Sequence, residues 1–357
     1  MDERIRFIIV GNSKRSEYLY APLLRMLTND VELVGVWGRS EGKARLLGDK
    51  YCVPWFTDLE KAIESVQPDA AIVSVDYSAN GEVGRKALDL GLPALLETPI
   101  AHDLADADVI INTAQMKGLR IEVAEQYYRR PIERIKTALV KEGFFGKVLT
   151  AYNDFMGHGY HGVSLIRSYF GFDVPVITVN GWKAQYPVDS HYAWISRTYE
   201  TRDETWEHGV IRFLGGQLGF FNWSSLAYDS PLRWQRSTRF FAEKGMGVGE
   251  QLTLLTPDGK DSQPIYIERR FHNVGGMETL SEIIAHTKPE IYWRNPFRGY
   301  YMDDEMIAVA DCIMSLVNAL RLNTLPEYGP VQARIDQAIV LAMNESASLN
   351  GASIKPR

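Results

Sequence analysis

The sequence predicts an α/β fold in two parts: an N-terminal doubly wound parallel sheet, then a C-terminal α+β domain that carries an open, mainly antiparallel sheet. Two observations predict it. Strand-like and helix-like segments alternate through residue 124, as in a parallel sheet with helices on both faces. From Val176 onward, strand-like runs follow one another without helices between them, which indicates antiparallel pairing. We therefore expect one domain over residues 1–124 and a second over residues 125–357.

In the first part, apolar segments are expected to form strands, and helical segments separate them. The apolar runs are nearly continuous, which is typical of strands that helices cover on both faces. The expected strands are Ile5–Val10, Val31–Val36, Ala70–Val75, Pro93–Leu96 and Leu119–Ala124. The expected helices are one that carries Leu19, Leu23, Leu24 and Leu27, and then Lys43–Tyr51, Asp58–Val66, Glu82–Leu90 and Leu104–Met116.

The second part contains helices near both of its ends and strands between them. Apolar residues at helical spacing mark the two long C-terminal helices. The expected helices are Pro131–Glu142, His161–Phe170, Met306–Leu322 and Val331–Leu349. The expected strands are Val148–Phe155, Val176–Trp182, Val210–Phe213, Leu218–Trp223, Phe240–Ala242, Leu252–Leu255 and Ile265–Glu268.

Composition and charge restrict the class of protein. Hydrophobic residues make up 45% of the chain and charged residues 24%, as in globular proteins. The net charge of −6 and the lack of a long basic run argue against nucleic acid or an anionic membrane as a partner. Cys52 and Cys312 have no metal-ligand spacing, so we expect no metal site and a reducing compartment. Neither a signal peptide nor a membrane span is apparent, so the cytoplasm is the expected location.

The turn after the first strand is a candidate phosphate-binding turn. Gly11, Ser13 and Ser16 stand where the G-x-G-x-x-G fingerprint of dinucleotide-binding proteins has its glycines. Only the first glycine is present, and the serines are small and can donate hydrogen bonds. Taken alone, an ordinary strand-to-helix turn explains these residues equally well.

The end of the second strand bears on which dinucleotide is bound. A carboxylate there would hold the ribose 2′-hydroxyl of NAD, and the segment Val36–Ser40 has none. Arg39 and Ser40 are suited to a 2′-phosphate, which favours NADP over NAD as the cofactor. The alternative is a solvated arginine before a helix N-cap.

The fourth expected strand ends in a polar segment, Glu97-Thr98-Pro99. Proline disfavours the helical conformation at the residue before it, so the strand should stop there. Ligands of open α/β sheets bind beyond the carboxyl ends of the strands. The segment is therefore a site candidate.

Several short motifs are spread over nearly the whole chain. They are Ala21-Pro22-Leu23-Leu24, Asn80-Gly81-Glu82, Glu97-Thr98-Pro99, Glu125–Pro131, Gly146-Lys147-Val148 and Glu345-Ser346-Ala347. Together they resemble the Gfo/Idh/MocA family of sugar oxidoreductases, with asparagine for the histidine of its H-x-E motif and threonine for the lysine of its E-K-P motif. The family implies a Rossmann domain followed by an α+β domain whose sheet carries the substrate face and an oligomer interface.

The resemblance implies a catalytic histidine and reveals two departures from the family. His161 matches the family's acid/base residue, which would take the proton of a sugar hydroxyl. Thr98 replaces the family's lysine and Gly157 its aspartate, so the pocket loses a positive charge. Asn80 and Glu97 are expected on the cofactor side.

Other polar residues are candidates to replace the missing groups. Tyr160 is a candidate catalytic partner of His161, and His158 is a candidate substrate residue. The remaining candidates are expected to line the substrate cleft or to supply charge: Tyr127, Tyr128, Arg129, Lys183, His191 and His208. Each has an ordinary alternative, because buried tyrosines mostly pack and surface lysines are mostly solvated.

Three functions remain open at this point. The first is an NAD(P)-dependent oxidoreductase that acts on a sugar, cyclitol or sugar derivative and associates as a homo-oligomer through the C-terminal sheet. The second is a glycoside-cleaving enzyme that retains its cofactor, oxidises the sugar transiently and eliminates the aglycone, with Tyr160 and His161 as the acid/base pair. The third is a non-catalytic sensor of sugar or nucleotide on the same scaffold.

Overall fold

The computed structural model describes residues 3–193, 198–226, 230 and 236–357, apart from the side chains of residues 190–193. The chain divides into two units. Unit 1 comprises Met1–Gln126 and Met302–Arg334, and unit 2 comprises Tyr127–Tyr301 and Ile335–Arg357. None of the described helices is long and apolar enough to cross a membrane.

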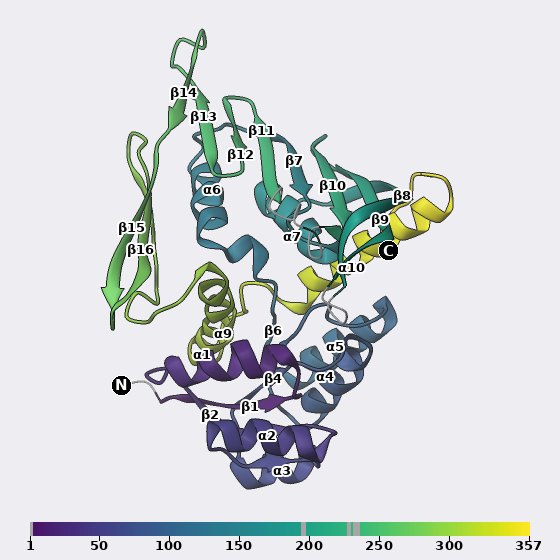
Figure 1. Cartoon of the computed structure of the whole chain (residues 1–357), viewed down its shortest axis with the longest axis vertical. Helices are drawn as coiled ribbons and strands as arrows, with labels where there is room; N and C mark the ends of the chain where they lie inside the picture. The colour runs from purple at the N-terminus through teal and green to yellow at the C-terminus, as the bar shows by residue number, and fades with distance from the viewer. Residues whose placement is uncertain (1–2, 194–197, 227–229, 231–235) are drawn as a thin grey trace. The chain divides into compact units, whose positions relative to one another are not determined.

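Unit 1 is built on a six-stranded, wholly parallel sheet in the order β3-β2-β1-β4-β5-β6 (Figure 1). This is the strand order of the dinucleotide-binding doubly wound fold, so the predicted fold of this part is confirmed. The strands are β1 (Ile5–Val10), β2 (Val31–Trp37), β3 (Trp55–Phe56), β4 (Ala70–Val73), β5 (Ala94–Leu96) and β6 (Ile121–Val123).

Helices separate these strands, and their ends follow the local sequence. Asp58 and Asp103 cap α3 and α5 by accepting hydrogen bonds from backbone amides of the first turn, and Gly118 ends α5 at φ +66°. The helical segments are η1 (Ser16–Tyr20), α1 (Ala21–Met26), α2 (Glu41–Tyr51), α3 (Leu59–Val66), η2 (Tyr77–Ala79), α4 (Asn80–Asp89) and α5 (Leu104–Lys117).

A later helix, α9 (Asp304–Leu322), packs against β5 and β6 of the same sheet. The backbone amide of Val123 donates a hydrogen bond to the carbonyl of Tyr328, and the buried Glu122 carboxylate accepts one from the Ser315 hydroxyl. The sequence-based division at residue 124 assigned all of this return segment to the second domain. The structure places Met302–Arg334 in unit 1, because tertiary contacts distant in sequence decide this assignment.

Unit 2 contains an eight-stranded sheet in the order β14-β13-β12-β11-β7-β10-β9-β8, in which only the β7–β10 pair is parallel. The predicted mainly antiparallel sheet is therefore confirmed. The strands are β7 (Val148–Asp154), β8 (Val176–Ala193), β9 (Thr198–Phe213), β10 (Leu218–Ser224), β11 (Ser237–Ala242), β12 (Gly245–Val248), β13 (Gln251–Leu255) and β14 (Ser262–Ile265).

A smaller antiparallel sheet and three helices complete unit 2. The sheet consists of β15 (Ile267–Val274), β16 (Met277–Ala285) and β17 (Ile291–Arg294). Helix α6 (Pro131–Lys141) packs on β16 and β17, and α7 (Gly159–Phe170) packs on β7 and β10. The short η3 (Tyr127–Arg129) precedes α6, and α10 (Pro330–Ser348) runs along β8 and β9, with its first residues assigned to unit 1.

Two facing glycines let the C-terminal part of α10 approach the sheet. Gly181 and Gly209 are paired on β8 and β9, and a Cβ atom at Gly181 would lie 2.2 Å from the Met343 carbonyl oxygen. The Ser346 hydroxyl accepts a hydrogen bond from the Gly181 amide. Past the helix, Ile354 forms an antiparallel bridge with Val179, at the outer side of the edge strand β8.

Candidate active site

A pocket of about 560 Å³ lies at the carboxyl ends of β1, β2 and β4 in unit 1. This is the edge at which doubly wound sheets bind dinucleotides. Four of the predicted cofactor residues line it, namely Gly11, Ser13, Arg39 and Ser40. The other lining residues are Asn12, Trp37, Lys43, Val75, Asp76 and Tyr77.

The turn after β1 requires glycine at its first position. Gly11 has a φ of +121°, and a Cβ atom there would lie 2.1 Å from the Ser74 carbonyl oxygen. Hydrogen bonds hold the two serines of the turn in place. Ser13 Oγ lies 2.7 Å from Ser74 Oγ, and the backbone amide of the buried Ser16 donates a hydrogen bond to Ser13 Oγ. Serine therefore replaces the later glycines by joining the ends of β1 and β4 with hydrogen bonds.

The pocket offers polar atoms that suit a dinucleotide. The side-chain nitrogens Asn12 Nδ2 and Trp37 Nε1 are buried and have no acceptor among the described residues. Buried donors of this kind need an acceptor, and the hydroxyl and phosphate oxygens of a dinucleotide supply acceptors. The residues present therefore fit the cofactor class that the sequence predicts.

Sequence reasoning missed two charged residues of this pocket, Lys43 and Asp76. Lys43 lies in the first turn of α2, three residues after Ser40, a spacing that was available in the sequence. The Asp76 carboxylate accepts hydrogen bonds from the amide and hydroxyl of Ser78, which lower its pKa, and Arg39 lowers it further. The pocket thus contains two cations and one carboxylate.

Strand β5 ends at Leu96, as predicted, and the Glu97-Thr98-Pro99 segment that follows contains a cis peptide bond before Pro99. Asn80 Nδ2 donates to the carbonyl oxygens of Glu97 and Pro99, each at 2.6 Å. Asn80 therefore positions the turn, which holds Thr98 half-buried between buried neighbours. Asn80, Glu97 and Ser16 do not line the nucleotide pocket, so their predicted cofactor role stays a prediction.

The positively charged side chain of Arg15, which was not predicted from the sequence, reaches this turn. Arg15 Nε donates to Glu97 Oε1, and the buried Tyr20 hydroxyl donates to the same oxygen at 2.7 Å. Burial is the largest single influence on the pKa of Arg15 and lowers it, but the Glu97 carboxylate and the Tyr20 hydroxyl together raise it above its ordinary value. Burial and the same carboxylate raise the pKa of Tyr20, so its hydroxyl stays protonated.

In unit 2, aromatic side chains surround His161 in the first turn of α7. Its ring centroid lies 4.4 Å from that of Tyr127, 4.6 Å from that of Tyr160 and 4.8 Å from that of His158. The His161 side chain is 6% exposed. The predicted catalytic pair Tyr160 and His161 is therefore in contact, together with the predicted substrate residue His158.

The absence of a side chain at Gly157 leaves room for His161 and the start of α7. A Cβ atom at Gly157 would lie 2.8 Å from the His161 Cβ and 2.9 Å from the Gly162 amide. The backbone of Gly157 is held by both side-chain atoms of Asn153, at 2.8 and 2.9 Å. An aspartate therefore does not fit at this position in the present backbone.

His158 is a neutral imidazole in this environment. Burial is the largest cause that lowers its pKa to about 3, followed by repulsion from His161, and Glu207 opposes the shift. A neutral imidazole can accept a hydrogen bond at one nitrogen and donate at the other.

The predicted substrate residues Tyr128 and Arg129 are almost completely buried, at 4% and 1% exposure. The Arg129 guanidinium lies 5.3 Å from the centre of the Tyr128 ring, and that ring makes an edge contact with Phe172. These contacts describe packing within unit 2, and the predicted substrate role stays a prediction.

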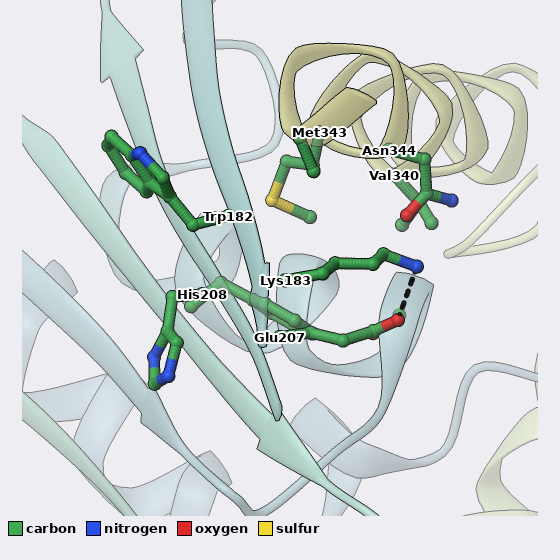
Figure 2. A pocket seen from close by; sticks show the side chains of 10 residues that line it. Trp182, Lys183, Glu207, His208, Val340, Met343 and Asn344 are labelled. Atoms are coloured by element: carbon green, nitrogen blue, oxygen red, sulfur yellow. Dashed lines mark ion pairs between the residues drawn. The ribbon is translucent and has the colours of Figure 1, made fainter. Parts of the chain in front are cut away.

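Lys183 forms an ion pair with Glu207, Nζ to Oε1 at 2.7 Å. Figure 2 shows the pair beside the α10 residues Val340, Met343 and Asn344, in a pocket that also includes Gly159 at the start of α7. The pocket volume of about 10 Å³ is close to that of one water site. The pocket is therefore too small for a sugar.

The remaining histidine candidates are His208 and His191. His208 also lines the small pocket, and its Nδ1 lies 2.8 Å from Asn222 Oδ1. The side chain of His191 lies outside the described residues. The described part of the chain contains no cluster of three or more histidine, cysteine, aspartate or glutamate side chains arranged to hold a metal ion.

The strand order and the pocket at the strand ends define a Rossmann-fold, dinucleotide-binding protein. Residues 5–125 match the family model GFO_IDH_MocA, described as an oxidoreductase family with an NAD-binding Rossmann fold. This match confirms, for residues 5–125, the family resemblance predicted from the motifs and a nicotinamide dinucleotide as the class of cofactor.

Individual relatives are distant. A D-xylose dehydrogenase from Paenarthrobacter nicotinovorans is 28% identical over 120 residues, which cover 33% of this chain and 31% of that protein. The aligned stretch thus spans about a third of that relative. A NAD-binding oxidoreductase from Klebsiella pneumoniae has a TM-score of 0.74 at 13% identity, with 99% of this chain and 100% of that chain covered. A levoglucosan dehydrogenase in complex with NADH and levoglucosan has a TM-score of 0.73 at 12% identity, with the same coverage. At this identity the structures share the fold.

Proposed function

We propose that this protein transfers a hydride between a nicotinamide dinucleotide and a carbinol carbon of a sugar, a cyclitol or a sugar derivative. The family match over residues 5–125 carries the proposal, because the nucleotide pocket is lined by residues of that segment. Sugar dehydrogenases among the similar proteins support the substrate class. The dinucleotide supplies the hydride acceptor, so the protein has to bind and orient both molecules and move one proton.

In this proposal His161 takes the proton of the reacting hydroxyl group. A C–H bond of the substrate breaks and its electron pair leaves with the hydride, while the O–H proton moves to the imidazole and a carbonyl forms. Tyr127 and Tyr160 hold the ring from two directions, and neutral His158 adds no positive charge beside it.

Thr98 and Lys183 are proposed to orient the substrate. The Thr98 hydroxyl is suited to hydrogen-bond a substrate oxygen, because Asn80 and Glu97 fix the turn that presents it. Lys183 is paired with Glu207 and its side chain retains 41% exposure, and the proposed contact with a substrate oxygen is on this exposed side, outside the water-sized pocket.

We propose NADP as the preferred dinucleotide. Arg39, Ser40 and Lys43 lie together in the pocket and suit a 2′-phosphate, for which a guanidinium and an ammonium are the usual partners. Asp76 in the same pocket opposes a dianion, because hydrogen bonds from Ser78 and, to a smaller extent, Arg39 lower the pKa of its carboxyl group and keep it ionised. The preference is therefore expected to be moderate.

We also propose that a second copy of this chain covers the open face of the large sheet. Tyr152 and Phe220 stack there with ring centroids 4.5 Å apart, and Asn222 joins His208 to Asp154 across adjacent strands. Aromatic residues are enriched at interfaces between subunits. Light scattering should give the mass of an oligomer, and Phe220→Asp should lower it.

The proposed activity is tested in two steps. Titration with NADP and NAD should show binding, and a panel of sugars, sugar acids and cyclitols should then change the absorbance of the reduced nicotinamide. Proven cofactor binding without turnover of any member of the panel would count against the activity. Failure to bind either dinucleotide would contradict the whole proposal and favour a sensor of other ligands.

One observation favours a second candidate, transient oxidation followed by glycoside cleavage. The rings of Tyr160 and His161 lie edge to face with centroids 4.6 Å apart, and Thr98 stands in place of the family's lysine. An aryl glycoside distinguishes the two reactions. Release of the aglycone without net change in the dinucleotide supports cleavage, whereas stoichiometric reduction of the dinucleotide supports the dehydrogenase.

A further inference from the structure

Arg15 connects two parts of unit 1 that are 82 residues apart in the sequence. It belongs to the turn after β1, and its Nε donates to the Glu97 carboxylate at the end of β5. Tyr20 donates to the same carboxylate oxygen at 2.7 Å, and the Thr98 amide donates to the other at 3.0 Å. Three donors therefore fix Glu97 directly beside Thr98.

The ion pair with Glu97 does not provide a hydrogen-bond acceptor for every nitrogen of the Arg15 guanidinium. Arg15 Nη2 is buried and has no acceptor among the described residues. Nη1 lies 3.6 Å from Glu305 on α9, which is too long for a well-formed hydrogen bond. A buried N–H group without an acceptor is unfavourable, and such groups are expected where a ligand provides the missing oxygen.

We propose that Arg15 belongs to the dinucleotide site and positions the Thr98 turn. Its Nη2 donates a hydrogen bond to an oxygen of the bound dinucleotide, while its Nε holds Glu97 and the Thr98 turn. The inference rests on the proposed function, because it takes a nicotinamide dinucleotide as the ligand. Arg15 does not itself line the nucleotide pocket, but its turn follows β1, and the turn after β1 and the end of β5 lie at the same edge of the parallel sheet as that pocket. Arg15 would thus couple cofactor binding to the placement of Thr98.

Two parts of the dinucleotide have oxygens that a guanidinium recognises: the pyrophosphate and the carboxamide of the nicotinamide. ADP-ribose or its 2′-phosphate distinguishes them, because these molecules retain the pyrophosphate and lack the nicotinamide. Binding of the whole dinucleotide and of the truncated molecule is therefore measured for each variant by calorimetric titration.

Arg15→Met should weaken binding of the dinucleotide about 10- to 100-fold, as for the loss of one charge-assisted hydrogen bond. Arg15→Lys keeps the charge but not the planar fork and should lie between Arg15→Met and the unchanged protein. Equal weakening for ADP-ribose assigns the oxygen to the pyrophosphate, and weakening of the dinucleotide alone assigns it to the carboxamide. Either result supports the proposal.

Unchanged dissociation constants for both ligands in both variants would overturn it. Arg85→Met is the matched control, because Arg85 lies on α4 of the same unit in an exposed pair with Asp89 and should leave binding unchanged. Thermal melting shows whether Arg15→Met folds. If it does not fold, the dissociation constants of Arg15→Lys are compared with those of the unchanged protein instead. If the unchanged protein binds no dinucleotide, the proposed function fails rather than the role of Arg15.

Discussion

The ring of Tyr127 lies 4.4 Å from the ring of His161, at an angle of 31° between the planes. The Arg130 guanidinium lies 4.6 Å from the centre of the same tyrosine ring. A cation over an aromatic ring attracts its π electrons and fixes the ring in place. The orientation of the candidate base therefore depends on Tyr127 and, through its ring, on Arg130.

The close approach of Gly157 to His161 gives a first prediction. Gly157→Ala should destabilise the protein by about 1–3 kcal/mol and reduce turnover, because the new methyl group displaces His161 or the start of α7. Urea denaturation measures the first effect and initial rates the second. Gly42→Ala on α2 is the control, since nothing lies within 4 Å of its added Cβ, and it should be neutral or slightly stabilising. Equal stability of the two variants would contradict the steric account.

Asn80 gives a second prediction. Asn80→Ala leaves the buried carbonyls of Glu97 and Pro99 without the donor they share, and should cost about 1–3 kcal/mol of unfolding free energy. Turnover should fall more than cofactor affinity, because the Thr98 turn loses its support. Asn112→Ala, an exposed change on α5, should lie within about 0.5 kcal/mol of the unchanged protein. A loss of stability with kcat intact would remove Asn80 from the positioning of Thr98.

Arg39 gives a third prediction, on cofactor preference. Arg39→Ala should raise the dissociation constant of NADP about 10- to 100-fold and leave that of NAD nearly unchanged, since only NADP carries the 2′-phosphate. Arg45→Ala removes an exposed arginine from the neighbouring helix α2 and should affect neither. If Arg39→Ala weakens both dinucleotides equally, Arg39 does not recognise the 2′-phosphate.

The lowered pKa of His158 predicts how stability depends on pH. The folded protein holds His158 neutral down to a pKa of about 3, whereas in the unfolded chain it takes up a proton near its ordinary pKa of 6.5. Between these values the unfolded state binds more protons, so the contribution of His158 to stability is present above about pH 6.5 and is lost as the pH falls. Replacement by Asn should flatten this part of the curve, measured by urea denaturation at pH 5 and pH 7.5. An unchanged pH dependence would contradict the assignment.

His286 should show the opposite dependence and serves as an internal comparison. Glu268 and Glu290 each accept a hydrogen bond from its ring at 2.8 Å and raise its pKa. A raised pKa stabilises the fold at low pH, and this stabilisation is lost as the pH rises through the folded pKa. His286→Gln should therefore lower stability at acidic pH and change it little at alkaline pH. Loss of stability at alkaline pH alone would contradict this.

The regular parts of the fold could be predicted because their sequence periods are strong. The β1 and β4 sequences are continuous apolar runs, and α9 and α10 carry apolar stripes at helical spacing. Strand β12, with the sequence Gly-Met-Gly-Val, was missed because glycine packs no side chain in a strand. The small sheet of β15, β16 and β17 was mostly missed because its charged faces hide the alternation.

The residues of the candidate site that belong to a sequence motif could be predicted. Those that are positioned by contacts between segments distant in the sequence could not. Gly11, Ser13, Arg39 and Ser40 were predicted and meet in one pocket, because they follow adjacent parallel strands. Arg15 was missed because Lys14-Arg15 in a turn resembles any solvated basic pair, and Glu97 is far from it in the sequence. Gly157 could be recognised as a departure from the family, but its contact with His161 required coordinates.

The backbone bridge between Val179 and Ile354 has a practical consequence for handling this protein. The unpaired side of an outer strand is a template for association with other chains, and here the last residues occupy part of it. Shortening the carboxyl end before Ile354 should therefore promote aggregation. An affinity label is better joined at the amino end.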